Sequence, residues 1–116
     1  MQLVANAIDA LPTAFRDKLD NVEIVVEDWP NQKVLKRAGV RHPAGLLGFY
    51  QGVPQTRRTH SYGLVLPDKI SLFQRPIELR CSTQNEIVQT IAHVLRHEIA
   101  HHFGIDDQRL RELGAY

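Results

Sequence analysis

Two histidines and a glutamate near the C-terminal end have the spacing of a reactive metal site. His97, Glu98 and His101 form the pattern H-E-x-x-H. On a helix, His97 and His101 would lie about 6 Å apart along the axis and about 40° apart around it, so both imidazoles can reach one metal ion. In this pattern the glutamate does not bind the metal but accepts a proton from a metal-bound water. Because the pattern fixes only three positions, it also fits a helix that merely carries two histidines.

A third ligand is predicted among the residues that follow the motif. If the helix continued, Asp107 would lie about 9 Å beyond His101 and about 240° around the axis, facing away from the metal. Gly104 can end the helix, because glycine accepts the left-handed conformation that commonly follows the last helical residue. Asp107 could then turn back as third ligand, which leaves one position open for water. Asp106 competes for this role, and we assign it as the N-cap of a short closing helix over 107–113.

Two other histidines of this segment fit the same site less well. His93 would lie about 12 Å from His101 along the axis, too far to share one ion. We expect it behind the ligands or on the surface. His102 points about 100° away from His101, so we expect it to contact solvent or neighbouring side chains.

These residues must be carried by a packed helix, predicted from Thr83 to Phe103. Thr83 can cap its first turn while Glu86 reaches back to the amide of the cap residue. Apolar residues then recur at spacings of three and four: Ile87, Val88, Ile91, Val94, Leu95 and Ile99. This stripe predicts a helix with one face on a core.

A small, mostly antiparallel sheet is expected to support the helix, which makes the predicted fold class α+β. Residues 22–27 alternate apolar and charged side chains and are rich in β-branched residues, so they form the clearest strand. Further strands are predicted at 46–51, 63–66 and 69–73, where short apolar runs lie between turn residues.

The segment between two of these strands, residues 52–62, is predicted to be a loop, since it is polar and has no period. It carries Arg57, Arg58, His60 and Tyr62. These side chains could hydrogen-bond an oxyanion if the fold brought them over the metal. The alternative is a solvated basic loop, which we favour.

The N-terminal part is expected to be helical. Apolar residues at helical spacing predict one helix over 3–11, and Pro12 can start a second one that buries Phe15 and Leu19. After the first strand, Asn31 can cap a short helix that closes at Gly39.

Composition narrows the possible classes of protein. With 116 residues, of which 43% are hydrophobic, the chain is expected to form one domain over 1–116. The net charge of +1 gives no general attraction to nucleic acid or an anionic membrane, so neither partner is expected. The single Cys81 and the absence of a signal sequence or membrane-length apolar run favour the cytoplasm. Nothing in the sequence indicates an oligomeric state.

The run from His97 to Asp107, HEIAHHFGIDD, resembles the extended zincin signature H-E-x-x-H-x-x-G-x-x-[H/D]. More closely, the chain is similar over nearly its full length to a family of small bacterial single-domain zincin-like metallopeptidases. Segments at 19–28, 46–54, 61–63 and 70–78 carry the resemblance together with the C-terminal run. It implies a minimal zincin-like domain with zinc bound by His97, His101 and Asp107, and Glu98 as the base.

Two departures from the larger metzincins bear on the substrate. Those enzymes have a methionine-containing turn beneath the metal, whereas the only methionine here is Met1. Only nine residues follow Asp107, so no C-terminal subdomain is available to form the lower wall of a cleft. We therefore expect short or unfolded peptides as substrates rather than folded proteins.

Three functions remain open from the sequence. The leading one is a zinc metallopeptidase that hydrolyses peptide bonds through a zinc-bound water activated by Glu98. A metal-dependent ribonuclease resembling ribosomal RNA maturation enzymes, with the motif H-x-x-x-H-x-x-G-x-D-H, would use Arg57 and Arg58 on phosphate. That family has glycine in place of Glu98 and histidine in place of Asp107. The third possibility is a zinc-bearing binding module without turnover.

Overall fold

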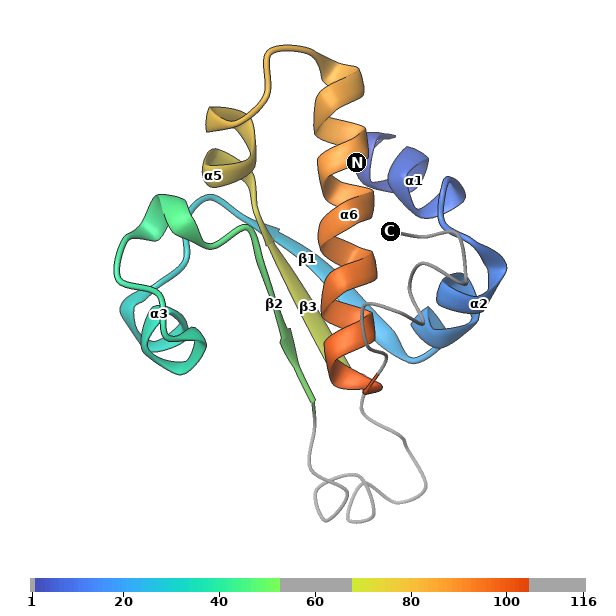
Figure 1. The fold of residues 1–116 in the computed structure, drawn as a ribbon, viewed down its shortest axis with the longest axis horizontal. Coiled ribbons are helices and arrows are strands. Elements are labelled where there is room, and N and C mark those ends of the chain that lie inside the picture. The colour runs from blue at the N-terminus through green and yellow to red at the C-terminus, as the bar shows by residue number, and fades with distance from the viewer. Residues whose placement is uncertain (1, 53–67, 105–116) are drawn as a thin grey trace.

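The structure is a computed structural model that describes residues 2–52 and 68–104 (Figure 1). Its elements in chain order are α1 (Gln2–Asp9), α2 (Thr13–Arg16), η1 (Asp17–Leu19), β1 (Val22–Glu27), α3 (Gln32–Ala38), η2 (Pro43–Gly45), β2 (Gly48–Gln51), β3 (Asp68–Phe73), α5 (Gln74–Leu79) and α6 (Gln84–His102). The predicted strand at 63–66, the closing helix at 107–113 and all but the first residue of the predicted loop at 52–62 lie outside the described residues.

The described strands form one three-stranded sheet in the order β1-β3-β2. β1 runs parallel to β3, with Val22 opposite Asp68, whereas β2 runs antiparallel to β3, with Gly48 opposite Leu72. The α+β class is thus confirmed, but the sheet is mixed rather than mostly antiparallel. The reason is the long crossover from β1 to β3, which passes through α3 and β2 and brings β3 back in the direction of β1.

The long helix α6 was predicted to within a residue at each end. Its N-cap is Thr83, whose hydroxyl accepts a hydrogen bond from the Glu86 amide at 3.1 Å. The Glu86 carboxylate accepts from that hydroxyl at 3.3 Å rather than from the cap amide. Gly104 follows the helix with φ of +70°, the left-handed conformation that the sequence predicted.

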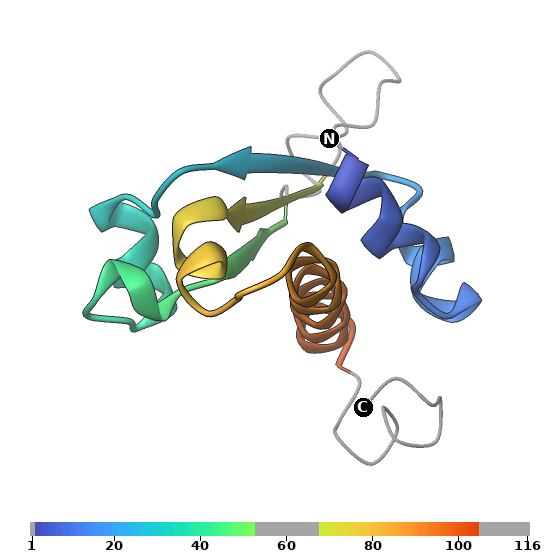
Figure 2. The same ribbon diagram turned by 90° about the horizontal axis from the view of Figure 1, so that it is seen from above.

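One face of α6 makes the core of the molecule. Figure 2 shows the helix end-on beside the sheet, with α1 and α2 to one side of it. Leu95 and Ile99 are fully buried and belong to one cluster with Phe15 of α2 and Ile70 of β3. At about 25 cal/mol per Å² of apolar surface, each such side chain contributes roughly 1.5–3 kcal/mol. The helix α6 is therefore held by apolar packing on the sheet.

The N-terminal elements follow the predicted pattern. α1 packs beside α6, and α2 begins at Thr13, with Pro12 as its N-cap residue. In α3 the Asn31 side chain caps the amide of Val34 at 2.8 Å, and Gly39 ends the helix with φ of +72°.

The short helix α5 was not predicted. It begins directly after β3, in residues between the predicted strand at 69–73 and the predicted helix from Thr83, where no element was assigned. Proline is tolerated in a first helical turn, where its missing N–H leaves no hydrogen bond unmade. Pro76 and Ile77 are buried, so α5 forms because this packing outweighs its weak local signal.

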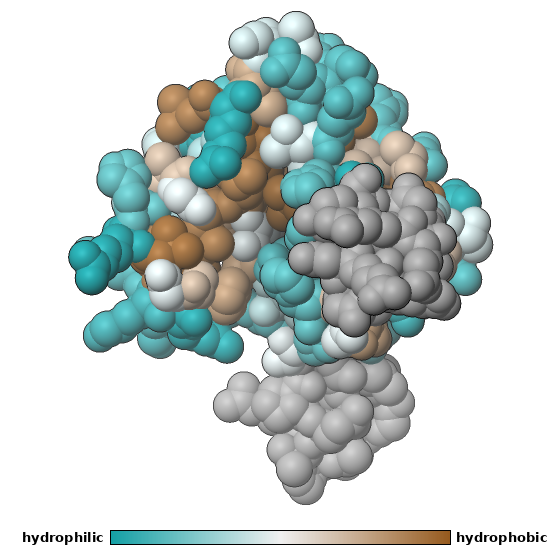
Figure 3. Space-filling view, in the orientation of Figure 1, coloured by the Kyte–Doolittle hydropathy of each residue, from teal (hydrophilic) through white to brown (hydrophobic). Residues whose placement is uncertain are grey.

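No helix in 2–52 or 68–104 is both long and apolar enough to cross a membrane. Figure 3 shows a hydrophobic area in the middle of the face that carries α6, bordered by hydrophilic residues.

Candidate metal centre

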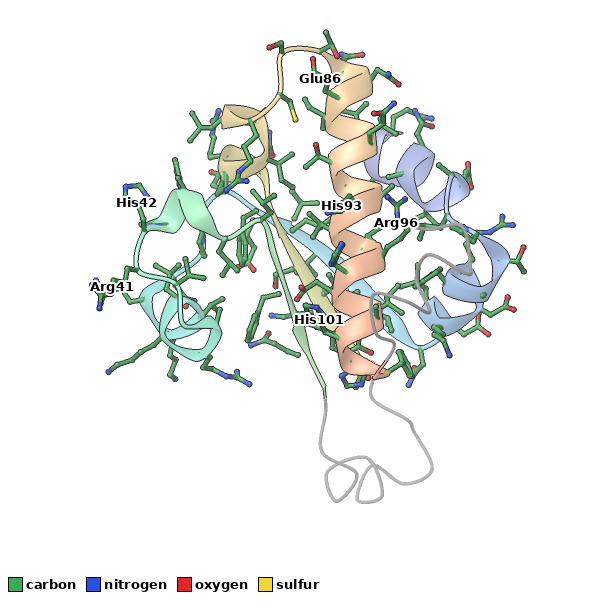
Figure 4. All side chains as sticks on the ribbon, in the orientation of Figure 1. Arg41, His42, Glu86, His93, Arg96 and His101 are labelled. Atoms are coloured by element: carbon green, nitrogen blue, oxygen red, sulfur yellow. The ribbon has the colours of Figure 1, made fainter. Side chains whose placement is uncertain are left out.

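The two histidines of the motif lie on the same side of α6, near its C-terminal end. Their ring centroids are 5.9 Å apart and their planes stand at 87° to each other. His97 is half-buried and His101 is exposed. Figure 4 shows His101 near the C-terminal end of α6. Two imidazoles at this separation on one helical face fit two corners of a tetrahedral metal site.

Glu98, between the two histidines in sequence, points toward the sheet. Its Oε1 accepts a hydrogen bond of 3.0 Å from the backbone N–H of Tyr50 in β2. Burial raises the pKa of the Glu98 carboxyl above its ordinary value, while the Tyr50 N–H and the nearby His101 act in the opposite direction. A partly desolvated carboxylate with a raised pKa is a better proton acceptor than one in water.

Gly48 allows β2 to approach the helix closely enough for this contact. A Cβ at position 48 would lie 2.5 Å from Cγ1 of Val94 and 3.1 Å from the backbone oxygen of Ser71. Any larger residue would push β2 away from α6. The sequence predicted a strand here but gave no sign that its glycine lets β2 approach the Glu98 carboxylate.

A cluster of three polar side chains, one each from α6, β2 and β3, lies next to the motif. The hydroxyl of Tyr50 donates a hydrogen bond of 2.8 Å to Oδ2 of the buried Asp68. The ring of His102 stacks on that of Tyr50 at 3.9 Å, with its Nε2 3.7 Å from the same Asp68 oxygen. His102 thus contacts neighbouring side chains, as expected, whereas Tyr50 and Asp68 were missed because nothing in the local sequence links them to Glu98.

His93 lies one helical turn before His97 and His101, which are called the metal pair below because they are the predicted metal ligands. Its ring centroid lies 4.3 Å from that of His97. Partial burial, and then the neighbouring His97 and Arg96, lower the pKa of His93. This favours the neutral imidazole at the position next to a predicted ligand.

The third predicted ligand, Asp107, lies outside the described residues, as do its competitor Asp106 and the loop residues Arg57, Arg58, His60 and Tyr62. Within 2–52 and 68–104, no three histidine, cysteine, aspartate or glutamate side chains gather as a metal site would require. The described part of the chain therefore supplies two of the three predicted ligands and the predicted base.

Comparison with known proteins adds an independent finding. A family model described as zincin-like metallopeptidase matches residues 19–115. No curated protein matches the chain.

Proposed function

Because the chain belongs to the zincin-like metallopeptidase family, we propose that it is a zinc-dependent hydrolase of peptide bonds in short or unfolded chains. The supporting observation is the position of Glu98. Its Oε1 accepts a hydrogen bond from the backbone N–H of Tyr50 in β2, and burial raises the pKa of the carboxyl.

His97 and His101 would hold the metal, with Asp107 as the proposed third ligand. Zinc supplies Lewis acidity, which polarises a substrate carbonyl and makes water acidic enough to lose a proton near neutral pH. His101 is exposed, so a substrate would approach the metal from its side of α6.

Glu98 would accept the proton of the attacking water. The Tyr50 amide donates its hydrogen bond to Oε1. No hydrogen bond joins Oε2 to any described residue, so Oε2 is the oxygen that would receive the proton. This one hydrogen bond from the backbone of β2 holds the Glu98 carboxylate in place but does not protonate it, so the carboxylate can still act as a base. Glu98 can later return this proton to the amine that leaves.

The test compares two glutamate variants, one at the proposed base and one away from the site. Glu98→Gln keeps the size of the side chain but cannot accept a proton, so it should retain zinc and lose roughly 10²- to 10⁴-fold in the rate of peptide cleavage. Glu23→Gln, at an exposed position of β1 away from the motif, should retain both. Zinc content and cleavage of a mixed library of short peptides are measured together.

The outcomes separate the alternatives. Cleavage by Glu98→Gln at the parental rate would show that Glu98 is not the base. If the zinc-loaded parent cleaves no peptide, the chain is a zinc-bearing binding module, and if it cleaves RNA instead, it is a nuclease.

A further inference from the structure

A groove of about 520 Å³ runs along the solvent-facing side of α6, on the N-terminal side of the metal pair. Gln89, His93 and Arg96 line it from the helix, and Arg80 lines it from the chain after α5. Figure 4 shows His93 and Arg96 on α6 between Glu86 and His101. The ring of His93, which lines the groove, lies 4.3 Å from that of His97, so this end of the groove is one residue contact away from the two motif histidines.

The helix places three hydrogen-bond donors together in this groove. Gln89, His93 and Arg96 are spaced i, i+4 and i+7, so their side chains share one face of α6. Among the described residues that line the groove the one carboxylate is Glu86, which lies ten residues before Arg96, about 15 Å away along the axis. It is also engaged with the Thr83 hydroxyl at the start of the helix. The end of the groove nearest the metal pair is therefore cationic.

Arg96 has no partner among the residues that the structure describes. Its Nε is buried without a hydrogen bond, and no ion pair neutralises its guanidinium within 2–52 and 68–104. A buried donor left unpaired is costly, and such groups are rare unless a ligand or water satisfies them. The planar guanidinium matches a carboxylate, which can accept two parallel hydrogen bonds from it.

We propose that this groove binds the C-terminal carboxylate of the peptide substrate, with Arg96 as the main donor and Gln89 and His93 beside it. The inference rests on the proposed function and deepens it, because it makes the chain a hydrolase that acts near the C-terminal end of a peptide. An extended peptide advances about 3.4 Å per residue, so residues next to the bound carboxylate would pass His93 toward His97.

The binding test uses the metal-free protein, so that it does not depend on hydrolysis. Acetyl-dialanine with a free carboxylate and the same peptide with a C-terminal amide are titrated into isotope-labelled protein, and the Nε–H signal of Arg96 is followed by NMR. The acid should bind about tenfold or more tightly than the amide, as expected for a hydrogen bond to a charged group.

Two arginine variants identify the site. Arg96→Gln should abolish the preference for the acid, whereas Arg41→Gln, an exposed arginine on the opposite side of the molecule in Figure 4, should keep it. Equal affinity for the two peptides, or a preference that survives Arg96→Gln, would overturn the site. Tighter binding of inorganic phosphate than of the acid would overturn the substrate class.

A second measurement distinguishes this inference from the proposed function. The zinc-loaded protein should cleave the acid form of a short peptide at least about tenfold faster than the amide form, at a bond close to the C-terminus. Equal cleavage of both forms would overturn the carboxylate inference and leave the hydrolase standing. Acid-selective binding without any cleavage would support the groove and contradict the hydrolase.

Discussion

The two histidines of the motif lie on the same side of α6, and each is a predicted metal ligand. The imidazole of His101 is exposed and that of His97 is half-buried. Loss of either should remove a metal bond directly. His97→Ala and His101→Ala should therefore weaken zinc binding by more than the roughly 10- to 100-fold that loss of a residue behind a ligand costs.

His93→Ala is the matched control on the same helix. Its ring contacts His97 but lies too far along the axis to share an ion with His101, so it should retain about one zinc per chain. Elemental analysis after dialysis against a weak chelator gives the comparison. Full zinc content in both His97→Ala and His101→Ala would contradict the site, and Asp107→Ala, measured alongside, tests the third ligand.

At the scale of the element, α6 depends on its first turn as well as its buried face. The Thr83 hydroxyl caps the Glu86 amide, so Thr83→Ala should lower the free energy of unfolding by about 1 kcal/mol. Thr83→Ser keeps the hydroxyl and should stay within a few tenths of the parent. Urea denaturation followed by circular dichroism measures both variants, and equal stability of the two would show that the cap contributes nothing.

A second prediction concerns the contact between β2 and α6. Gly48→Ala would force its methyl group against Val94 and the backbone of Ser71, which should cost about 1–3 kcal/mol of stability. Because β2 carries the Tyr50 amide, the same change should also loosen Glu98 and slow peptide cleavage without removing the metal ligands.

Gly45→Ala serves as its control. The added methyl group there would meet only Cγ1 of Val40, at 3.2 Å, and that side chain can move aside. A Gly48→Ala protein as stable as Gly45→Ala would show that β2 has room to shift away from the helix.

For the molecule as a whole, the fold and the metal should be separable. The core around Phe15, Ile70, Leu95 and Ile99 is buried without any contribution from the metal pair, so the metal-free protein should remain folded. Zinc that binds only the native state should then add about 2.7 kcal/mol at a free concentration one hundred times its Kd.

Thermal unfolding with and without chelator measures this difference. We expect a lower Tm but an unchanged circular dichroism spectrum in the chelated protein, and no effect of zinc on the Tm of His97→Ala. Loss of helical signal on chelation at low temperature would mean that the metal, rather than the apolar core, holds α6 in place.

Elements whose signals are local could be predicted from the sequence alone. Thr83, the apolar stripe and Gly104 fixed the start, face and end of α6, because capping and periodicity act within a few residues. The same reasoning located β1 and α3. It also placed His97 and His101 on one side of a helix, since that follows from a spacing of four.

The way in which these elements pack together depends on contacts between distant parts of the chain. The parallel pairing of β1 with β3 follows from a crossover whose path no local pattern encodes, and α5 forms through burial of Pro76 and Ile77. The environment of Glu98 depends on the Tyr50 amide, 48 residues earlier, and on Gly48, which lets β2 approach. Propensity and spacing describe a chain over a few residues, whereas the strength of a base and the partners of a buried arginine depend on which distant segments pack beside them.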